Sequence, residues 1–274
     1  MARLILMRHG QSMWNLDPNR PELPWKYAGA VDVPLSEKGI TEAIRAGKAL
    51  RELPIDVVYC SMLIRAQTTT LIALASHQEK KAPLLVRDSE TEPDKRGLRA
   101  HKAKMSKGSH QTVLPVYCSY QLNERSFGEL QGMYEWEQKR KFSKRDLREF
   151  RREWDVPFPG GESQAQVFDR TVRFFERHIR GQLNQGKNVL ICCHGFVVRA
   201  ILAYILELSP QDFRHQMDLD LAHDPASLLH SKNAIPRVFS YEPTKPDSRE
   251  LKGAFKDISD QYPFKESKPA KSKL

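Results

Sequence analysis

Residues 3–10 read Arg3-Leu4-Ile5-Leu6-Met7-Arg8-His9-Gly10, an apolar run that ends in a polar tripeptide. A short apolar run followed by polar residues and glycine is typical of a buried strand that enters a loop. The same pattern returns at Val189–Cys193, which is followed by His194 and Gly195. Parallel strands end at one edge of a sheet, so His9 and His194 are expected to converge if the two strands are neighbours.

Helical and strand-like segments alternate along the rest of the chain. Ser36 is a typical helix cap, and Pro54 separates its helix from the next apolar run. The alternation predicts an α/β fold in three layers, with a mostly parallel central sheet and helices on both faces. The predicted helices are 36–53, 62–75, 135–152, 163–185 and 196–206, and the further strands are 56–59, 84–87, 113–118 and 234–241.

The chain of 274 residues is long enough for one large domain with an insertion. Residues 1–242 are predicted to form this single catalytic domain. Residues 88–112 are polar and charged, which indicates an insertion and not a core element. Residues 243–274 are polar and poor in apolar side chains, so they are predicted to form a flexible tail.

The formal net charge of +10 predicts an anionic partner. Nucleic acid, an acidic membrane and a phosphorylated metabolite all fit this charge. No apolar run reaches the roughly 18–20 residues of a membrane span, and the early strand leaves no room for a signal peptide. The four cysteines have no metal-binding spacing, which favours a reducing compartment and predicts no metal site.

The tripeptide Ser272-Lys273-Leu274 follows a segment rich in lysine, proline and serine. This tripeptide is the peroxisomal address, so we expect a peroxisomal protein if the source is a eukaryote and a cytoplasmic protein otherwise. Chance also produces such a tripeptide in a segment of this composition, so both alternatives stay open.

Further charged residues lie where strands end or helices begin and end. Arg65, early in the helix after the second strand, can direct its planar guanidinium at phosphate oxygens. Glu124 lies in a loop, where a carboxylate beside histidines and arginines can relay a proton. Arg151 and Arg152 diverge by about 100° on a helix, so they reach one ligand only near a helix end. Each of these residues alone is equally compatible with an ordinary surface position.

Together these segments resemble the histidine phosphatase superfamily, and within it the phosphoglycerate mutases that depend on 2,3-bisphosphoglycerate. The resemblance covers roughly residues 3–242 and is interrupted at 88–112. It rests on five motifs in the family's order, which are Arg8–Asn15, Ser61–Thr68, Leu122–Gly132, Asp155–Ser163 and His194-Gly195.

The resemblance implies a role for each matching residue. His9 would be the nucleophile that becomes phosphohistidine, and Glu124 would be the general acid and base. Arg8, Arg65 and His194 would form a cage around the transferred phosphoryl group. The implied substrate contacts are Asn15, Ala28, Gly29, Arg125, Phe127, Arg151, Arg152, Gly195 and Phe196.

The implied reaction is the interconversion of 3-phosphoglycerate and 2-phosphoglycerate in glycolysis and gluconeogenesis. In such an isomerase 2,3-bisphosphoglycerate primes the histidine as phosphoryl donor, and no metal is required. The partner would be a small phosphorylated acid, with neither nucleic acid nor a membrane expected. A homo-oligomer stays open, because family members are often dimers or tetramers.

Three positions depart from the mutase pattern. Phe127 stands where these mutases usually carry tyrosine, and Phe196 replaces the asparagine that follows His-Gly. Glu135 occupies the approximate position of a substrate-binding lysine, although Lys139 follows one helical turn later. These changes remove polar or cationic contacts and leave the phosphohistidine residues intact. A histidine phosphatase that hydrolyses a small phosphorylated metabolite is therefore the alternative.

A basic module that binds nucleic acid is a second alternative, supported by the net charge and by the basic runs at 95–107 and 139–152. Against it, aromatic and basic residues do not interleave as in a single-strand platform, and no groove-reading motif occurs. Binding that collapses with salt and survives His9→Ala would favour this module.

Overall fold

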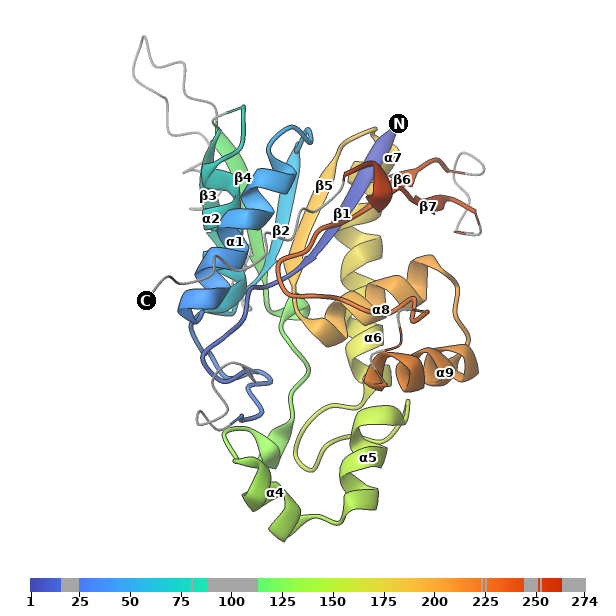
Figure 1. The fold of residues 1–274 in the computed structure, drawn as a ribbon. Helices are drawn as coiled ribbons and strands as arrows, with labels where there is room; N and C mark the ends of the chain where they lie inside the picture. The colour runs from blue at the N-terminus through green and yellow to red at the C-terminus, as the bar shows by residue number, and fades with distance from the viewer. Residues whose placement is uncertain are drawn as a thin grey trace.

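A seven-stranded sheet forms the centre of the computed structural model (Figure 1). The structure describes residues 1–15, 25–79, 81–87, 113–222, 224, 226–243, 251 and 253–262. The strands are β1 (Ala2–Arg8), β2 (Val57–Ser61), β3 (Ala82–Arg87), β4 (Val113–Ser119), β5 (Val189–Cys193), β6 (Arg237–Tyr241) and β7 (Phe255–Asp257). Their order is β3-β4-β2-β5-β1-β6-β7. The strands from β3 to β1 run parallel, β6 runs antiparallel to β1, and β7 runs antiparallel to β6, which confirms the predicted mostly parallel sheet.

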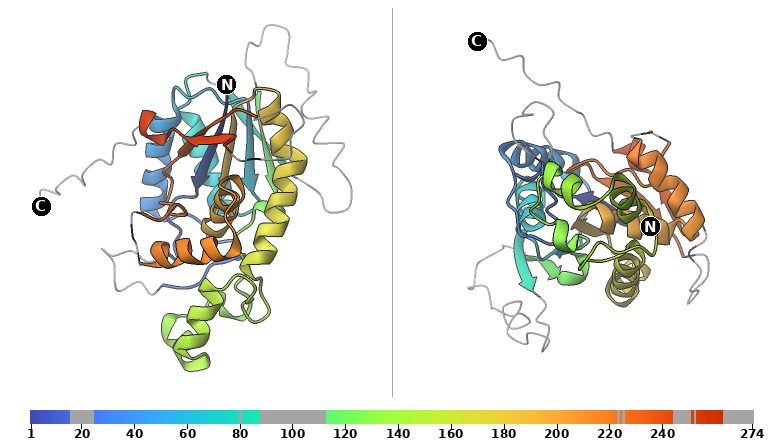
Figure 2. Two further views of the ribbon diagram at one scale, coloured as in Figure 1. Left: turned by 90° about the vertical axis from the view of Figure 1, so that its right-hand side faces the viewer. Right: turned by 90° about the horizontal axis from the view of Figure 1, so that it is seen from below.

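Helices cover both faces of this sheet, as Figure 2 shows in its left view. Alternate side chains of β1 enter two separate cores, because successive residues of a strand point to opposite faces. Leu4 and Leu6 pack with α6 and α8, whereas Ile5 and Met7 pack with α1 and α2. The helices are α1 (Glu37–Leu50), α2 (Ile64–Ala75), α4 (Glu135–Lys141), α5 (Lys144–Arg152), α6 (Gln164–Phe174), α7 (Arg180–Asn184), α8 (Gly195–Ile205) and α9 (Pro210–Leu221), with a π turn at Phe175–Ile179 that joins α6 to α7.

The basic segment 135–152 is two helices, where the sequence predicted one. Phe142 is extended, with φ −127° and ψ 145°, and ends α4. Ser143 then caps α5, because its side chain accepts from the backbone N–H of Asp146 while the Asp146 carboxylate accepts from Ser143. Both helices lie at the end of the sheet where β1 and β5 end (Figure 1).

Two elements were not predicted from the sequence. α9 begins at a capping box formed by Ser209 and Asp212, with Pro210 in its first turn, and it buries Phe213 and Met217. β7 lies within the segment predicted as a polar tail and pairs with β6. The sheet therefore extends beyond residue 242.

Some predictions concern residues outside the described part of the chain. The insertion at 88–112 and the tripeptide at 272–274 both lie there. Within the described ranges, no helix is long and apolar enough to cross a bilayer. Within the same ranges, no cluster of three or more His, Cys, Asp or Glu side chains is arranged to hold a metal ion.

Candidate active site

The ends of β1 and β5 bring His9 and His194 together. The two strands are parallel neighbours, with Arg8 in register with Cys193. Each histidine is the next residue along its strand's direction, and the His9 backbone N–H donates to the Cys193 carbonyl at 3.0 Å. The imidazole centroids lie 4.9 Å apart. The convergence predicted from the two apolar runs is therefore observed.

The hydrogen bonds of His9 fix which nitrogen carries its proton. Nδ1 lies 2.6 Å from the Gly10 carbonyl, which can only accept, so Nδ1 carries the hydrogen. Nε2 keeps its lone pair and accepts from Arg65 Nε at 3.3 Å. Burial, followed by the charges of Arg65 and Arg8, holds the pKa of His9 well below its usual value. His9 is thus a neutral imidazole whose Nε2 can act as a nucleophile.

Arg65 is held rigidly beside His9. Its side chain is 1% exposed, and its Nη1 and Nη2 each donate at 2.7 Å, to the carbonyls of Val31 and Gly29. Burial lowers the pKa of Arg65 to about 10, so its guanidinium stays charged at neutral pH. Gly29 has a φ of +49°, and a Cβ there would lie 2.5 Å from Gln131 Oε1. Only glycine suits this turn.

His194 occupies the N-cap of α8 and is fully buried. Ser61 donates its hydroxyl hydrogen to Asn123 Oδ1 at 2.8 Å, so His194 Nε2 donates to Ser61 Oγ at 2.7 Å. Nδ1 of His194 is buried and has no partner among the described residues. Burial, then the neighbouring Arg65 and His9, hold the pKa of His194 well below its usual value.

The Glu124 carboxylate caps the first turn of α8. Oε2 accepts from the Gly195 N–H at 3.1 Å, and Oε1 accepts from the N–H groups of Phe196 at 3.1 Å and Arg125 at 3.0 Å. The side chain is buried yet reaches the cavity that contains His9. Glu124 is therefore fixed in direction by backbone donors, with a position suited to proton transfer.

Arg199 was missed at the level of sequence. It lies one helical turn after Gly195, on the same side of α8, and its guanidinium is ion-paired with Asp220 of α9. A Cβ on Gly195 would lie 3.7 Å from Arg199 Nη1, Arg8 Nε and Glu124 Oε2 alike. The spacing of one helical turn from Gly195 could have pointed to Arg199. Asp220, the partner of Arg199, belongs to a helix that was not predicted.

Most of these groups line a cavity of about 170 Å³; His194 is buried behind this wall and does not line it. The predicted residues that line it are Arg8, His9, Asn15, Ala28, Gly29, Arg65, Glu124, Phe127, Gly195 and Phe196. The lining residues that were not predicted are Ser12, Trp25, Lys26, Tyr27 and Arg199. The cavity thus combines a neutral nucleophile, a carboxylate and several cations, which is an arrangement suited to an anionic substrate.

Three predicted substrate contacts do not line this cavity. Arg125 is fully buried and donates to the carbonyls of Glu162 at 2.8 Å and Val156 at 3.1 Å. Arg151 Nε donates to the hydroxyl of Tyr27, which does line the cavity. Arg152 diverges from Arg151 and pairs with Asp218 of α9 at 2.5 Å. The adjacent arginines therefore face different partners.

The three departures from the mutase pattern also lie in different places. Phe127 and Phe196 line the cavity, with ring centroids 5.8 Å apart. Glu135 is exposed on α4 and pairs with Lys139 at 2.7 Å. The two phenylalanines therefore change the wall of the cavity, whereas Glu135 does not line it.

Comparison with known proteins agrees with this geometry. A family model described as the histidine phosphatase superfamily (branch 1) matches residues 4–89 and 98–230. The chain is 41% identical over 211 residues to 2,3-bisphosphoglycerate-dependent phosphoglycerate mutase 1 of Arabidopsis thaliana, which is 77% of this chain and 60% of that protein. It is 40% identical over 202 residues to the 2,3-bisphosphoglycerate-dependent phosphoglycerate mutase of Protochlamydia amoebophila, which is 74% of this chain and 84% of that protein.

Solved structures share the fold at lower identity. The α-ribazole phosphatase of Shigella flexneri has a TM-score of 0.59 at 21% identity, covering 88% of this chain and 91% of that one. A mycobacterial glucosyl-3-phosphoglycerate phosphatase has a TM-score of 0.60 at 19% identity, covering 87% and 89%.

Proposed function

The chain belongs to the histidine phosphatase superfamily, and from this premise we propose that it interconverts 3-phosphoglycerate and 2-phosphoglycerate through a phosphohistidine on His9. The similarity to the two mutases named above supports this proposal. The chain spans 60% of the length of the Arabidopsis relative.

The observation that carries the proposal is the state of His9. Its Nδ1–H is engaged by the Gly10 carbonyl, so Nε2 is the atom that forms the bond to phosphorus. Phosphorylated His9 then transfers its phosphoryl group to the 2-hydroxyl of 3-phosphoglycerate, and the N–P bond breaks as the new O–P bond forms. His9 takes back the phosphoryl group from the 3-position, and 2-phosphoglycerate leaves.

The cations around His9 stabilise the charge on the transferred group. Arg65 donates to Nε2 in the free enzyme, and in the reaction this donor passes to the phosphoryl oxygens that bind there. Arg8 lines the same cavity. His194 can donate from Nδ1 only as imidazolium, because the hydrogen of the neutral ring is on Nε2 and donates to Ser61 Oγ. A bound anion supplies the charge that favours this protonation.

Glu124 handles the proton of the hydroxyl group. As a carboxylate it accepts the proton when the substrate oxygen attacks the phosphohistidine, and it returns the proton when the other oxygen leaves. Three backbone N–H groups hold the carboxylate in place, which keeps its direction constant through both steps.

The donors of the cavity fit 2,3-bisphosphoglycerate, which would supply the phosphoryl group that first loads His9. Arg8 Nε and Arg199 Nε are buried nitrogens without partners among the described residues, and anionic oxygens would satisfy them. Gly195 leaves open the space beside both arginines. Arg8, Arg65 and Arg199 are therefore the residues proposed to hold the bisphosphate.

The second candidate is a histidine phosphatase that hydrolyses a small phosphorylated metabolite. Phe127 and Phe196 favour it, because they place apolar rings in the cavity wall where the mutase pattern has polar groups. A phosphatase needs the same nucleophile and cations together with a path for water. The oligomeric state and the peroxisomal address stay predictions.

The test is the conversion of 3-phosphoglycerate to 2-phosphoglycerate with and without catalytic 2,3-bisphosphoglycerate. We expect activity that requires the bisphosphate, disappears in His9→Ala, and persists in His215→Ala, whose histidine is exposed on α9. Release of phosphate without isomerisation would overturn the mutase and support the phosphatase. Acid-labile labelling of the His9→Ala variant would remove the nucleophile assignment itself.

A further inference from the structure

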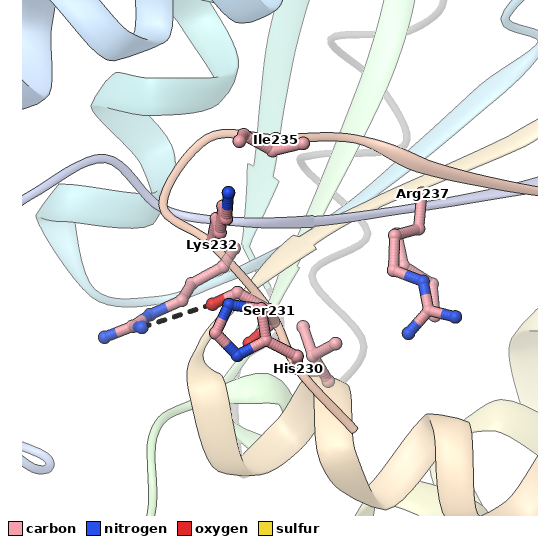
Figure 3. Close-up of a pocket in the computed structure, with 8 residues that line it drawn as sticks. His230, Ser231, Lys232, Ile235 and Arg237 are labelled. Carbon is pink, nitrogen blue, oxygen red and sulfur yellow. Dashed lines mark hydrogen bonds between the residues drawn. The ribbon is translucent and has the colours of Figure 1, made fainter. Parts of the chain in front are cut away.

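A second cavity has a volume of about 330 Å³, and Arg8 lines both this cavity and the catalytic one. Figure 3 shows His230, Ser231, Lys232, Ile235 and Arg237 around it. Leu6 and Arg8 of β1 and Val198 of α8 form part of its wall. The remainder comes from the segment between α9 and β6 and from the first residue of β6, namely His230, Ser231, Lys232, Ile235 and Arg237. The reaction proposed above uses Arg8 alone among these residues.

The ionisable side chains that line this cavity are basic, namely Arg8, His230, Lys232 and Arg237. The carboxylates next to this wall are already engaged: Asp257 accepts from Arg237 at 2.7 Å, and Asp220 accepts from His230 at 2.9 Å. The Ser231 hydroxyl is buried and has no partner among the described residues. The charges of Arg237 and His230 thus face these carboxylates, whereas Arg8 Nε and the Ser231 hydroxyl have no partner among the described residues and can bind an anion.

An apolar wall of Leu6, Val198 and Ile235 lies among these polar groups. A bare phosphate ion would leave this wall without contacts, whereas a carboxylic acid with a short aliphatic chain would cover it. The volume falls in the range of small-molecule sites, about 300–1,000 Å³. We propose that this cavity binds a small aliphatic carboxylate, and that its binding slows phosphoryl transfer at His9.

Two connections join this cavity to the catalytic one. Arg8 Nη1 donates to the Ser231 carbonyl at 3.4 Å, a long bond that a carboxylate would replace with a charge-assisted one (Figure 3). Such a carboxylate moves the Arg8 guanidinium away from the phosphoryl group. It also offsets part of the positive charge that Arg8 directs at that group. The second connection is Asp220, which accepts from His230 in one cavity and pairs with Arg199 in the other.

The binding test uses 3-methylbutanoate as the probe and the neutral 3-methylbutanamide as its matched control, with saturation-transfer NMR on the free protein. We expect 3-methylbutanoate to bind at least about tenfold more tightly than the amide, because the charge-assisted bonds are lost in the amide. Ile235→Trp, which fills the cavity, and Lys232→Gln, which removes an exposed charge at its wall, should both weaken binding. Lys26→Gln, in the catalytic cavity, should leave it unchanged.

Equal binding of acid and amide, or no binding of the acid, would overturn the proposal. Loss of binding in Lys26→Gln but not in Ile235→Trp or Lys232→Gln would do so as well, since it would place the probe in the catalytic cavity. The effect on catalysis rests on the proposed function, and it is measured separately as a fall in kcat with 3-methylbutanoate that Ile235→Trp abolishes. Binding without this fall would overturn the coupling, whereas a protein without mutase activity would still give the binding result.

Discussion

His9 and His194 are buried imidazoles that share their surroundings with Arg8 and Arg65. The free enzyme keeps both rings neutral, since adding a proton to either would place a further positive charge among these arginines. An anionic phosphoryl group reverses this balance, because it brings negative charge to the same space. In the proposed reaction His9 is therefore nucleophilic before the substrate binds, and we expect His194 to gain a proton when the anionic substrate binds.

The neutral histidines predict a dependence of stability on pH. In the unfolded chain both histidines have a pKa of about 6.5, whereas folding lowers the pKa of both. Below this pH the unfolded state therefore binds more protons than the folded state. With respect to these two histidines, the free energy of unfolding should be highest above about pH 6.5. It should fall on acidification by up to about 1.4 kcal/mol per pH unit for each histidine. Urea unfolding at about pH 7.5 and about pH 5.5 measures this slope.

His9→Gln should reduce the slope, and His215→Gln, which changes an exposed histidine, should leave it unchanged. The same slope in wild type and His9→Gln would contradict the assignment of a neutral His9.

Arg65→Lys tests whether the guanidinium is needed for more than its charge. Lysine keeps the positive charge but cannot bond Gly29, Val31 and His9 at once, as the guanidinium does. We expect kcat to fall by about 100-fold, the usual cost of losing one preorganised donor. Arg148→Lys, at an exposed position on α5, is the matched control and should keep wild-type kcat. Wild-type activity in Arg65→Lys would show that a point charge is enough.

At the scale of elements, the parts of the site that follow strand ends could be predicted and those fixed by helix packing could not. His9 and His194 follow from two apolar runs, because parallel strands end at one edge. Arg199 depends on its ion pair with Asp220, which exists only after α9 packs against α8. Arg125 is next to Glu124 in sequence, but it donates hydrogen bonds to the carbonyls of Val156 and Glu162. These bonds depend on contacts between loops that are distant in the chain.

The turn at Gly29 gives a prediction about one element that positions Arg65. Gly29→Ala should destabilise the protein and lower kcat, because its Cβ would collide with Gln131 Oε1 and displace the carbonyl that holds Arg65. Gly186→Ala is the matched control, since Gly186 also has a positive φ, +78°, but open space around it. It should cost about 1–2 kcal/mol of stability from backbone strain alone and leave kcat unchanged. Equal effects of both variants on kcat would remove the role of this turn.

At the scale of the whole molecule, the sheet is larger than the sequence predicted. β7 has three residues, two of them charged, and it carries no periodic pattern. Its position depends on tertiary contacts, such as Phe255 against Tyr241, with centroids 4.8 Å apart, and against Phe175 at 6.3 Å. A short strand of this kind is specified by tertiary packing, which local composition does not reveal.

The net charge of +10 also acts at this scale, because it attracts an anionic substrate before contact is made. We expect kcat/KM for 3-phosphoglycerate to fall as KCl shortens the Debye length from about 30 Å at 0.01 M to about 10 Å at 0.1 M, with a smaller change in kcat.

The double variant Lys144→Glu with Arg148→Glu tests this effect, because it removes two charge units at each position and lowers the net charge from +10 to +6. Both residues are exposed on α5, so this variant should weaken the salt dependence without altering the buried groups around His9. A salt dependence that is equal in the two proteins would assign the effect to the arginines of the cavity instead of the overall charge. Binding of single-stranded DNA that shows the same salt response and survives His9→Ala would instead support the nucleic-acid module, because the phosphate backbone is then the anion that the surface attracts.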